Sequence, residues 1–205
     1  MKTRLLVCAA LLAATSGLAL AEETAKAKGA AAKQPMDPKA MEEMMMKLAM
    51  PGPNHERLKK LVGEWNLTVK WTPDPSQPMS ETKSTSTVTS LMDGRYFQEL
   101  SEGDMGGQPF RGMGVTGYDN ILKKYVSTWI DNMGTGIMTS QGTADASGNV
   151  LNWMGESSDP MTGKTAKYRM VTRFADDDHH TFEMYSKTPD GKEFKSMVIS
   201  YERKM

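Results

Sequence analysis

The chain has 205 residues, which is enough for one ordinary domain and too few for two. Its 25 basic residues balance its 25 acidic residues, which argues against a nucleic-acid partner and against membrane docking through a polybasic patch. Val, Ile, Leu and Phe together make up only about 16% of the chain, whereas Met occurs 19 times. We therefore expect one domain whose core is filled in part by methionine.

The first residues have the features of a secretory signal. Lys2 and Arg4 precede an apolar run over residues 5–12, and Ala19-Leu20-Ala21 matches the A-x-A cleavage pattern. We expect residues 1–21 to be a signal peptide and the mature protein to be periplasmic or secreted. No later segment is apolar over the roughly 20 residues that a membrane-spanning helix needs, so we expect no transmembrane segment in the mature protein.

A flexible linker and a Met-rich helix are predicted next. Residues 22–36 are rich in Ala and Lys and have no periodic apolar positions, which is typical of a linker. Asp37-Pro38 then supplies an N-cap and a proline at the first helical position. Four apolar residues follow at the spacing of one helical face: Met41, Met44, Met45 and Leu48. We predict a Met-rich amphipathic helix over residues 37–50 that packs or contacts a partner, with soft thioether binding of Cu(I) as the alternative.

Residues 51–205 are predicted to form an all-β domain. After a short helix near residues 54–62, apolar and polar residues alternate, beginning with Trp65, Leu67, Val69 and Trp71. Turns rich in Gly, Pro, Asn and Asp then recur about every ten to fifteen residues without a helical interruption. About ten short strands must either close on themselves or expose long edges, so we predict an antiparallel meander closed into a barrel.

One short motif resembles a feature of the lipocalins and the wider calycin superfamily. Gly63-Glu64-Trp65 opens the first predicted strand after a short helix, as the G-x-W motif does in those barrels. The resemblance implies that Trp65 closes one end of the barrel and packs near a basic residue of the last strand. Arg203, in the final predicted strand, is the expected partner.

A longer series of segments resembles a bacterial family known only as domain of unknown function 1579, over roughly residues 51 to 203. The matching segments occur in this order: Pro51-Gly52-Pro53-Asn54-His55, Leu61-Val62-Gly63-Glu64-Trp65, Pro109-Phe110-Arg111-Gly112, Gly117-Tyr118-Asp119-Asn120, Trp129-Ile130-Asp131-Asn132, Phe182-Glu183-Met184-Tyr185 and Asp190-Gly191-Lys192-Glu193-Phe194-Lys195. The resemblance implies a calycin- or lipocalin-like barrel and brings no established activity with it.

Aromatic residues in the predicted strands point to a ligand cavity. Trp129 and Asp131 share one strand face with Tyr125 and Ser127, so this face mixes aromatic and polar groups. A cavity lined in this way suits a small apolar or amphipathic molecule. The ligand-binding residues that we predict are Trp65, Tyr118, Trp129, Asp131 and Tyr185. The alternative is that the aromatic side chains simply fill the barrel.

The sequence predicts no catalytic residue, no metal site and no cofactor. The only cysteine, Cys8, lies in the predicted signal peptide, so the mature protein would have no thiol for catalysis or metal binding. His55 lies at a helix start, and His179-His180 adjoin an acidic turn, where we expect a solvated hairpin tip rather than a metal or heme site.

Two other function classes stay open beside the binding protein. An enzyme would use carboxylates that face a cavity, for which Asp131, Glu156 and Glu183 are the candidates. A structural or interaction protein of the cell envelope would instead use the outer faces of the barrel and the Met-rich helix.

Overall fold

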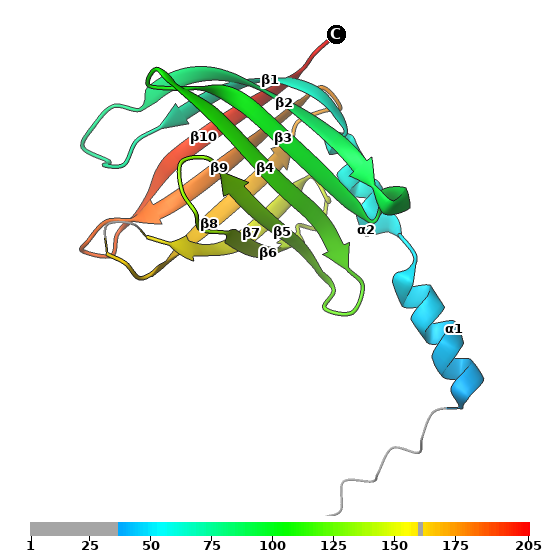
Figure 1. The fold of residues 1–205 in the computed structure, drawn as a ribbon. Coiled ribbons are helices and arrows are strands. Elements are labelled where there is room, and N and C mark those ends of the chain that lie inside the picture. The colour runs from blue at the N-terminus through cyan, green and yellow to red at the C-terminus, as the bar shows by residue number, and fades with distance from the viewer. Residues whose placement is uncertain (1–36, 160–161) are drawn as a thin grey trace, which may run out of the picture. The chain divides into compact units, whose positions relative to one another are not determined.

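A ten-stranded antiparallel barrel dominates the computed structural model, which describes residues 37–159 and 162–205 (Figure 1). The predicted signal peptide and linker, residues 1–21 and 22–36, lie outside the described residues. Within the described ranges, no helix is long and apolar enough to cross a membrane.

The strands of the barrel follow one another along the chain and each pairs with the next. They are β1 (Gly63–Trp71), β2 (Ser80–Leu91), β3 (Tyr96–Met105), β4 (Gln108–Asp119), β5 (Lys124–Asp131), β6 (Met138–Ala144), β7 (Val150–Ser158), β8 (Thr165–Phe174), β9 (His179–Lys187) and β10 (Glu193–Arg203). β1 also pairs with β10, which closes the barrel and leaves no free edge. The predicted closed antiparallel meander is therefore confirmed.

Two helices precede the barrel. α1 spans Pro38–Ala49, and α2 spans Pro53–Leu58 and continues as a 3-10 turn, η1, over Lys59–Leu61. Pro53 occupies the first turn of α2, where its missing N–H costs no hydrogen bond. A second 3-10 turn, η2 (Met92–Gly94), joins β2 to β3.

The methionines of α1 are solvent-exposed. Within the described part of the chain, no side chain of α1 is buried, although Met41, Met44 and Met45 share one face. The end of the helix is held through its backbone, because Asn120 Nδ2 donates hydrogen bonds to the carbonyl oxygens of Leu48 and Met50 at 2.8 and 2.9 Å. Contact of this face with a partner therefore stays a prediction.

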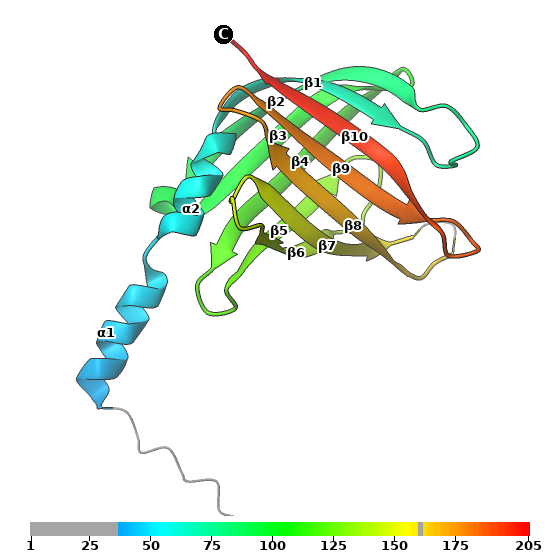
Figure 2. The ribbon, with the colours of Figure 1, turned by 180° about the vertical axis from the view of Figure 1, so that it is seen from behind.

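The hydrophobic core lies toward one end of the barrel. Because consecutive strands are antiparallel, the starts of the odd-numbered strands and the ends of the even-numbered strands meet at the same end. We call this the closed end; α2 packs there, and its Leu58 is fully buried (Figure 2). The core residues from the strands are Trp65, Leu67, Val88, Phe97, Tyr125, Leu151, Trp153, Met170, Phe174 and Tyr201.

Aromatic rings, more than methionines, fill this core. Met170 is its one methionine among the described residues, while Met138 and Met184 pack against it at lower burial. Tyr125 makes edge-to-face contacts with Tyr118 and Trp153, at centroid distances of 5.0 and 6.0 Å. The expectation of a methionine-filled core is thus only partly met, because a few large rings occupy most of the closed end.

Trp65 and Trp71 lie on the same face of β1 and allow a matched test of this packing. Trp65 is 1% exposed at the closed end and Trp71 is 42% exposed at the other end. Replacing Trp65 by Ala is expected to lower the free energy of unfolding by about 3–5 kcal/mol, as for other large aromatic residues removed from a core. Trp71→Ala is expected to cost about 1 kcal/mol or less. Urea denaturation followed by circular dichroism measures both, and equal losses would contradict the assigned core.

Candidate functional site

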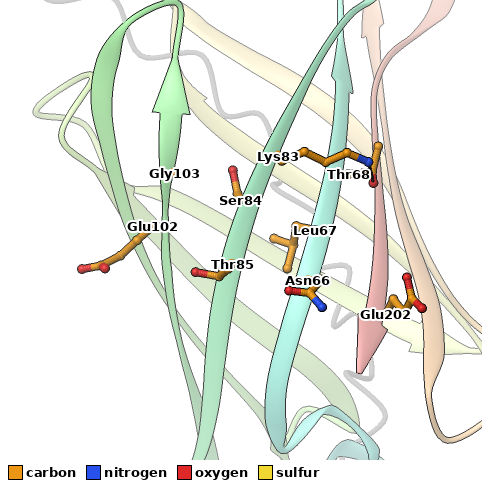
Figure 3. Close-up of a pocket in the computed structure, with 9 residues that line it drawn as sticks. All are labelled: Asn66, Leu67, Thr68, Lys83, Ser84, Thr85, Glu102, Gly103 and Glu202. Carbon is orange, nitrogen blue, oxygen red and sulfur yellow. Dashed lines mark hydrogen bonds between the residues drawn. The ribbon is translucent and has the colours of Figure 1, made fainter. Parts of the chain in front are cut away.

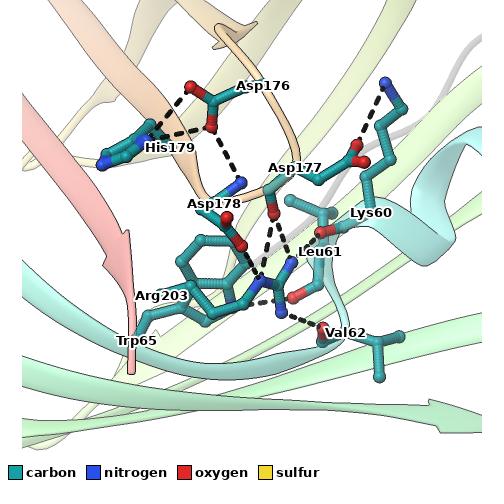
Figure 4. Close-up of polar contacts among 9 residues, drawn as sticks. All are labelled: Lys60, Leu61, Val62, Trp65, Asp176, Asp177, Asp178, His179 and Arg203. Carbon is teal, nitrogen blue, oxygen red and sulfur yellow. Dashed lines mark hydrogen bonds and ion pairs between the residues drawn. The ribbon is translucent and has the colours of Figure 1, made fainter. Parts of the chain in front are cut away.

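Arg203 and Trp65 seal the closed end of the barrel (Figure 4). The two residues are register partners in β10 and β1, and Arg203 Cζ lies 4.2 Å from the centroid of the Trp65 ring. The guanidinium also donates hydrogen bonds to the carbonyl oxygens of Val62, at 2.8 Å, and Asp177, at 2.6 Å. The indole N–H of Trp65 donates to the carbonyl oxygen of Leu61 at 2.8 Å. The predicted pairing of Trp65 with Arg203 is confirmed.

His180 belongs to this sealed core. Its side chain is 5% exposed and stacks on Tyr201, with ring centroids 4.1 Å apart. Burial, together with the nearby charge of Arg203, lowers the pKa of His180 from 6.5 to about 3, so the ring is neutral at ordinary pH. Only His179 is exposed, where it contacts the Asp176 carboxylate at 2.9 Å. The expectation that both histidines lie at a solvated tip is wrong for His180, because it faces the barrel interior.

Helix α2 is joined to the barrel through buried and half-buried polar groups. Arg57 Nη1 donates hydrogen bonds to Tyr125 Oη at 2.7 Å and to Asn54 Oδ1 at 3.0 Å. Its guanidinium lies directly against Gly148, where a Cβ atom would come within 2.4 Å of Arg57 Nη2. His55 is buried beside Tyr118 and accepts a hydrogen bond from the Gly52 N–H. These contacts hold α2 against the closed end of the barrel.

The opposite part of the barrel, which we call the open half, is formed by the ends of the odd-numbered strands and the starts of the even-numbered ones. Its inward-facing side chains remain partly accessible to solvent although ten strands surround them; examples are Phe110, Trp129, Tyr168 and Met184. Small hydroxyl residues also face inward here, among them Ser84, Ser127, Ser140 and Ser157. The open half therefore combines apolar surfaces, hydroxyl groups and space that solvent reaches.

Trp129 lies flat against the inner wall of the open half. A Cβ atom on Gly112 would come within 2.3 Å of Trp129 Cζ2, and one on Gly114 within 3.0 Å of Cε3. The ring thus covers two glycines of β4 that have no side chains to displace it. Its indole N–H donates a hydrogen bond to Asp131 Oδ2 at 3.0 Å, which fixes the orientation of the ring.

A carboxyl group, Glu99, faces the interior near the boundary between the two halves. Ser101 Oγ donates a hydrogen bond to Glu99 Oε1 at 3.2 Å. Burial raises the pKa of Glu99, and the adjacent hydroxyls of Ser86, Ser101 and Tyr201 partly offset the effect. Burial also raises the pKa of Tyr201, and the adjacent Glu99 charge adds to this effect.

Glu99 could not be predicted as an interior residue, because the apolar pattern of β3 indicates the opposite orientation of the strand. Tyr96 and Leu100 suggest that the alternate face of this strand is buried, yet both are exposed. The register with β4 settles the orientation, because Glu99 pairs with the inward-facing Gly114.

The five predicted site residues do not form one site. Trp129 and Asp131 are together in the open half, whereas Trp65 and Tyr118 lie in the closed end. Tyr185 faces outward, where Arg169 Cζ lies 3.6 Å from its ring centroid and its hydroxyl donates to Glu183. Of the three carboxylates considered for catalysis, Asp131 alone faces the interior; Glu156 and Glu183 alternate with the inward-facing residues of β7 and β9.

Two shallow grooves lie on the wall of the barrel. One, of about 530 Å³, crosses β10, β1, β2 and β3 (Figure 3). Its exposed residues include Asn66, Thr85, Glu102 and Glu202, each on a different strand. The other, of about 840 Å³, crosses β5 to β8. Both grooves are open to solvent and bordered by charged side chains, which makes them less suited than the interior to an apolar molecule.

Metal ligands are not gathered anywhere in the described ranges. Across residues 37–159 and 162–205, no group of three or more His, Cys, Asp or Glu side chains could hold a metal ion.

The closed ten-strand barrel, with its G-x-W tryptophan beneath an arginine of the last strand, defines a calycin-like barrel protein. Residues 50–203 match the family described as Protein of unknown function (DUF1579). The chain therefore belongs to the DUF1579 family, as the sequence motifs predicted. No curated protein matches the chain.

Among solved structures, the crystal structure of Rv2717c from M. tuberculosis is similar in fold. It has a TM-score of 0.55 at 14% sequence identity, and the match covers 76% of this chain and 100% of that one. A redesigned β-barrel matches with a TM-score of 0.39 at 12% identity, over 73% of this chain and 96% of the other, which is too weak to bear on the fold.

The buried neutral His180 makes stability depend on pH in a defined direction. The unfolded chain takes up a proton near pH 6.5, whereas the folded protein does so only near pH 3. Stability is therefore fully retained above pH 6.5 and falls as the pH drops toward 3, by up to about 1.4 kcal/mol per pH unit. His180→Phe, which keeps a ring on Tyr201, is expected to lose this part of the slope, and the exposed-site control His179→Phe to keep it. Urea denaturation at stepped pH measures the slopes; identical slopes in the two variants would contradict the assignment.

Proposed function

We propose that this protein is an exported carrier that binds a small apolar or amphipathic molecule in the open half of its barrel and does no chemistry on it. The observation that supports this proposal is the partial solvent exposure of inward-facing side chains such as Phe110, Trp129 and Tyr168. Side chains that fully packed a barrel interior would exclude water, as they do at the closed end.

The chemistry of the open half favours an amphipathic ligand. The Trp129 ring offers a flat apolar surface, and Met138 and Met184 offer flexible thioether side chains that adapt to different shapes. Inward hydroxyls, such as those of Ser127 and Ser140, provide hydrogen-bonding groups that orient a polar end.

The closed end supports this function by providing a rigid floor. Its rings are buried, and Arg57 and Arg203 tie the neighbouring backbone to them. A ligand in the open half then meets a preformed surface, so little ordering free energy is spent on binding.

An enzyme is the second candidate, and Glu99 is the observation that favours it. A carboxyl with a raised pKa is the kind of group that acid–base catalysis uses. The groups nearest to it in the described structure, however, are the hydroxyls of Ser86, Ser101 and Tyr201, with no second carboxyl or imidazole among them. This arrangement suits ligand binding better than proton transfer between two groups.

Binding is testable with neutral environment-sensitive dyes, Nile red and N-phenyl-1-naphthylamine. Both are expected to bind saturably and to quench tryptophan fluorescence. Trp129→Ala is expected to weaken binding about tenfold, because it removes a large aromatic wall. Ile130→Ala is the matched control, since Ile130 is the next residue of β5 and faces outward. The proposal would be overturned if neither dye bound saturably, or if Trp129→Ala and Ile130→Ala weakened dye binding equally.

Export is testable by N-terminal sequencing of the protein from the cell envelope and medium. The mature chain is expected to begin at Glu22, after the A-x-A pattern at residues 19–21. Ala19→Asp places a charge where the pattern requires a small residue and is expected to leave the precursor uncleaved. A wild-type protein that retains Met1 would contradict the proposed export.

A further inference from the structure

We infer that the barrel selects an amphipathic amine, whose protonated nitrogen binds at Glu99 and whose apolar part lies against Trp129. This inference rests on the proposed function, because it requires that the open half hold a ligand. It specifies the chemical class of that ligand, which neither the family nor the fold indicates.

The charges that face the interior are unbalanced. The strands direct Glu99 and Asp131 inward, whereas the Lys and Arg residues of the described strands face outward, with Arg203 as the exception. Arg203 is engaged at the closed end by the Trp65 ring and by backbone carbonyls. His180, beside Tyr201, is neutral. An ionised Glu99 therefore has hydroxyl partners but no cation, and a ligand ammonium supplies the missing charge.

Ser86, a neighbour of Glu99, is a second buried group whose hydrogen bonding is incomplete. Its side chain is 2% exposed and faces inward next to Ser101, its register partner in β3. Ser86 Oγ lies near the Glu99 carboxyl but makes no hydrogen bond of normal geometry in the described structure. A buried hydroxyl without a partner is costly. An ammonium group carries three donors and no acceptor, so it satisfies the Glu99 carboxylate and the Ser86 oxygen together.

The position of Trp129 places an apolar wall beside this polar group. Glu99 pairs with Gly114 of β4, and Gly114 pairs with Trp129 of β5, so the three positions lie in one row across the sheet. The Trp129 ring covers Gly114 from inside. A ligand with its nitrogen at Glu99 therefore passes directly over the indole face, which attracts cations as well as apolar groups.

The test compares three probes with the same chain length and different head groups: decylamine, 1-decanol and decanoate, each below its micelle concentration. Isothermal titration calorimetry at pH 7.5 is expected to show decylamine binding about tenfold more tightly than 1-decanol, and decanoate most weakly. Glu99→Gln is expected to remove the preference for decylamine and to leave the affinity for 1-decanol within about twofold. The matched control is Glu102→Gln, which neutralises an exposed carboxylate on the other face of the same strand.

The pH dependence of decylamine binding provides a second readout, which does not require replacing Glu99. Amine binding needs the ionised carboxylate, so decylamine affinity is expected to fall as the pH drops through the raised pKa of Glu99. The other titratable groups that face the interior from the strands are Asp131, His180, Arg203, Tyr118, Tyr125, Tyr168 and Tyr201, and Arg57 of α2 contacts Tyr125; all of them are unchanged in the variants compared. Ser101→Ala removes a hydrogen bond that favours the carboxylate, and should move the loss of affinity to higher pH.

The outcomes separate the inference from the proposed function. If none of the three probes binds, the proposed binding function fails and the inference fails with it. If all three bind equally, or if Glu99→Gln leaves the decylamine preference intact in a variant that melts like the wild type, the amine assignment is wrong while ligand binding stands. If Glu99→Gln does not fold, the Ser101→Ala shift decides, and an unchanged pH midpoint overturns the assignment.

Discussion

The guanidinium of Arg203 links the first and last strands of the barrel and reinforces the closure that the pairing of β1 with β10 creates. It lies over the Trp65 ring and donates hydrogen bonds to carbonyl groups before β1 and in the turn between β8 and β9. The first strand, the last strand and a distant turn are thereby held at one point. An arginine suits this position because its planar group stacks on an aromatic ring while several N–H donors remain available.

A tightly packed closed end allows the other half to be less filled. Buried aromatic rings and the Arg57 contacts of α2 stabilise the fold locally, so the open half does not need a dense core. Glycines and small hydroxyl residues line much of its wall, and at Gly112 and Gly114 the ring of Trp129 rests on bare backbone. The most deeply buried part of the fold is thus confined to one end of the barrel axis.

The distribution of charge follows from the same division between inside and outside. On the outer wall, Arg169 pairs with Glu193 at 2.6 Å, and Lys195 pairs with Glu183. The exposed Arg169–Glu193 pair contributes little to stability because water screens it. The interior carboxylate Glu99 is different, since burial raises its pKa and its neighbours donate only hydroxyl hydrogen bonds. Glu99 therefore lies inside the barrel, where water screens charge least.

Local patterns in the sequence determine much of the fold, and a small part of the site. Recurrent turn residues predict the strand order, period-2 alternation predicts that Trp129 and Asp131 share a face, and the G-x-W motif predicts the contact between Trp65 and Arg203. The same alternation excludes Tyr185 from the face that Phe182 occupies in β9, so the outward position of Tyr185 could be predicted from the sequence.

The orientation of β3 could not be predicted from the sequence, because apolar residues occur on both of its faces. Only pairing with β2 and β4 turns Glu99 inward and leaves Leu100 49% exposed. Register is a property of strand pairing, and a shift of one residue exchanges every side chain between the two faces. The tertiary structure therefore decided which carboxylate the barrel encloses.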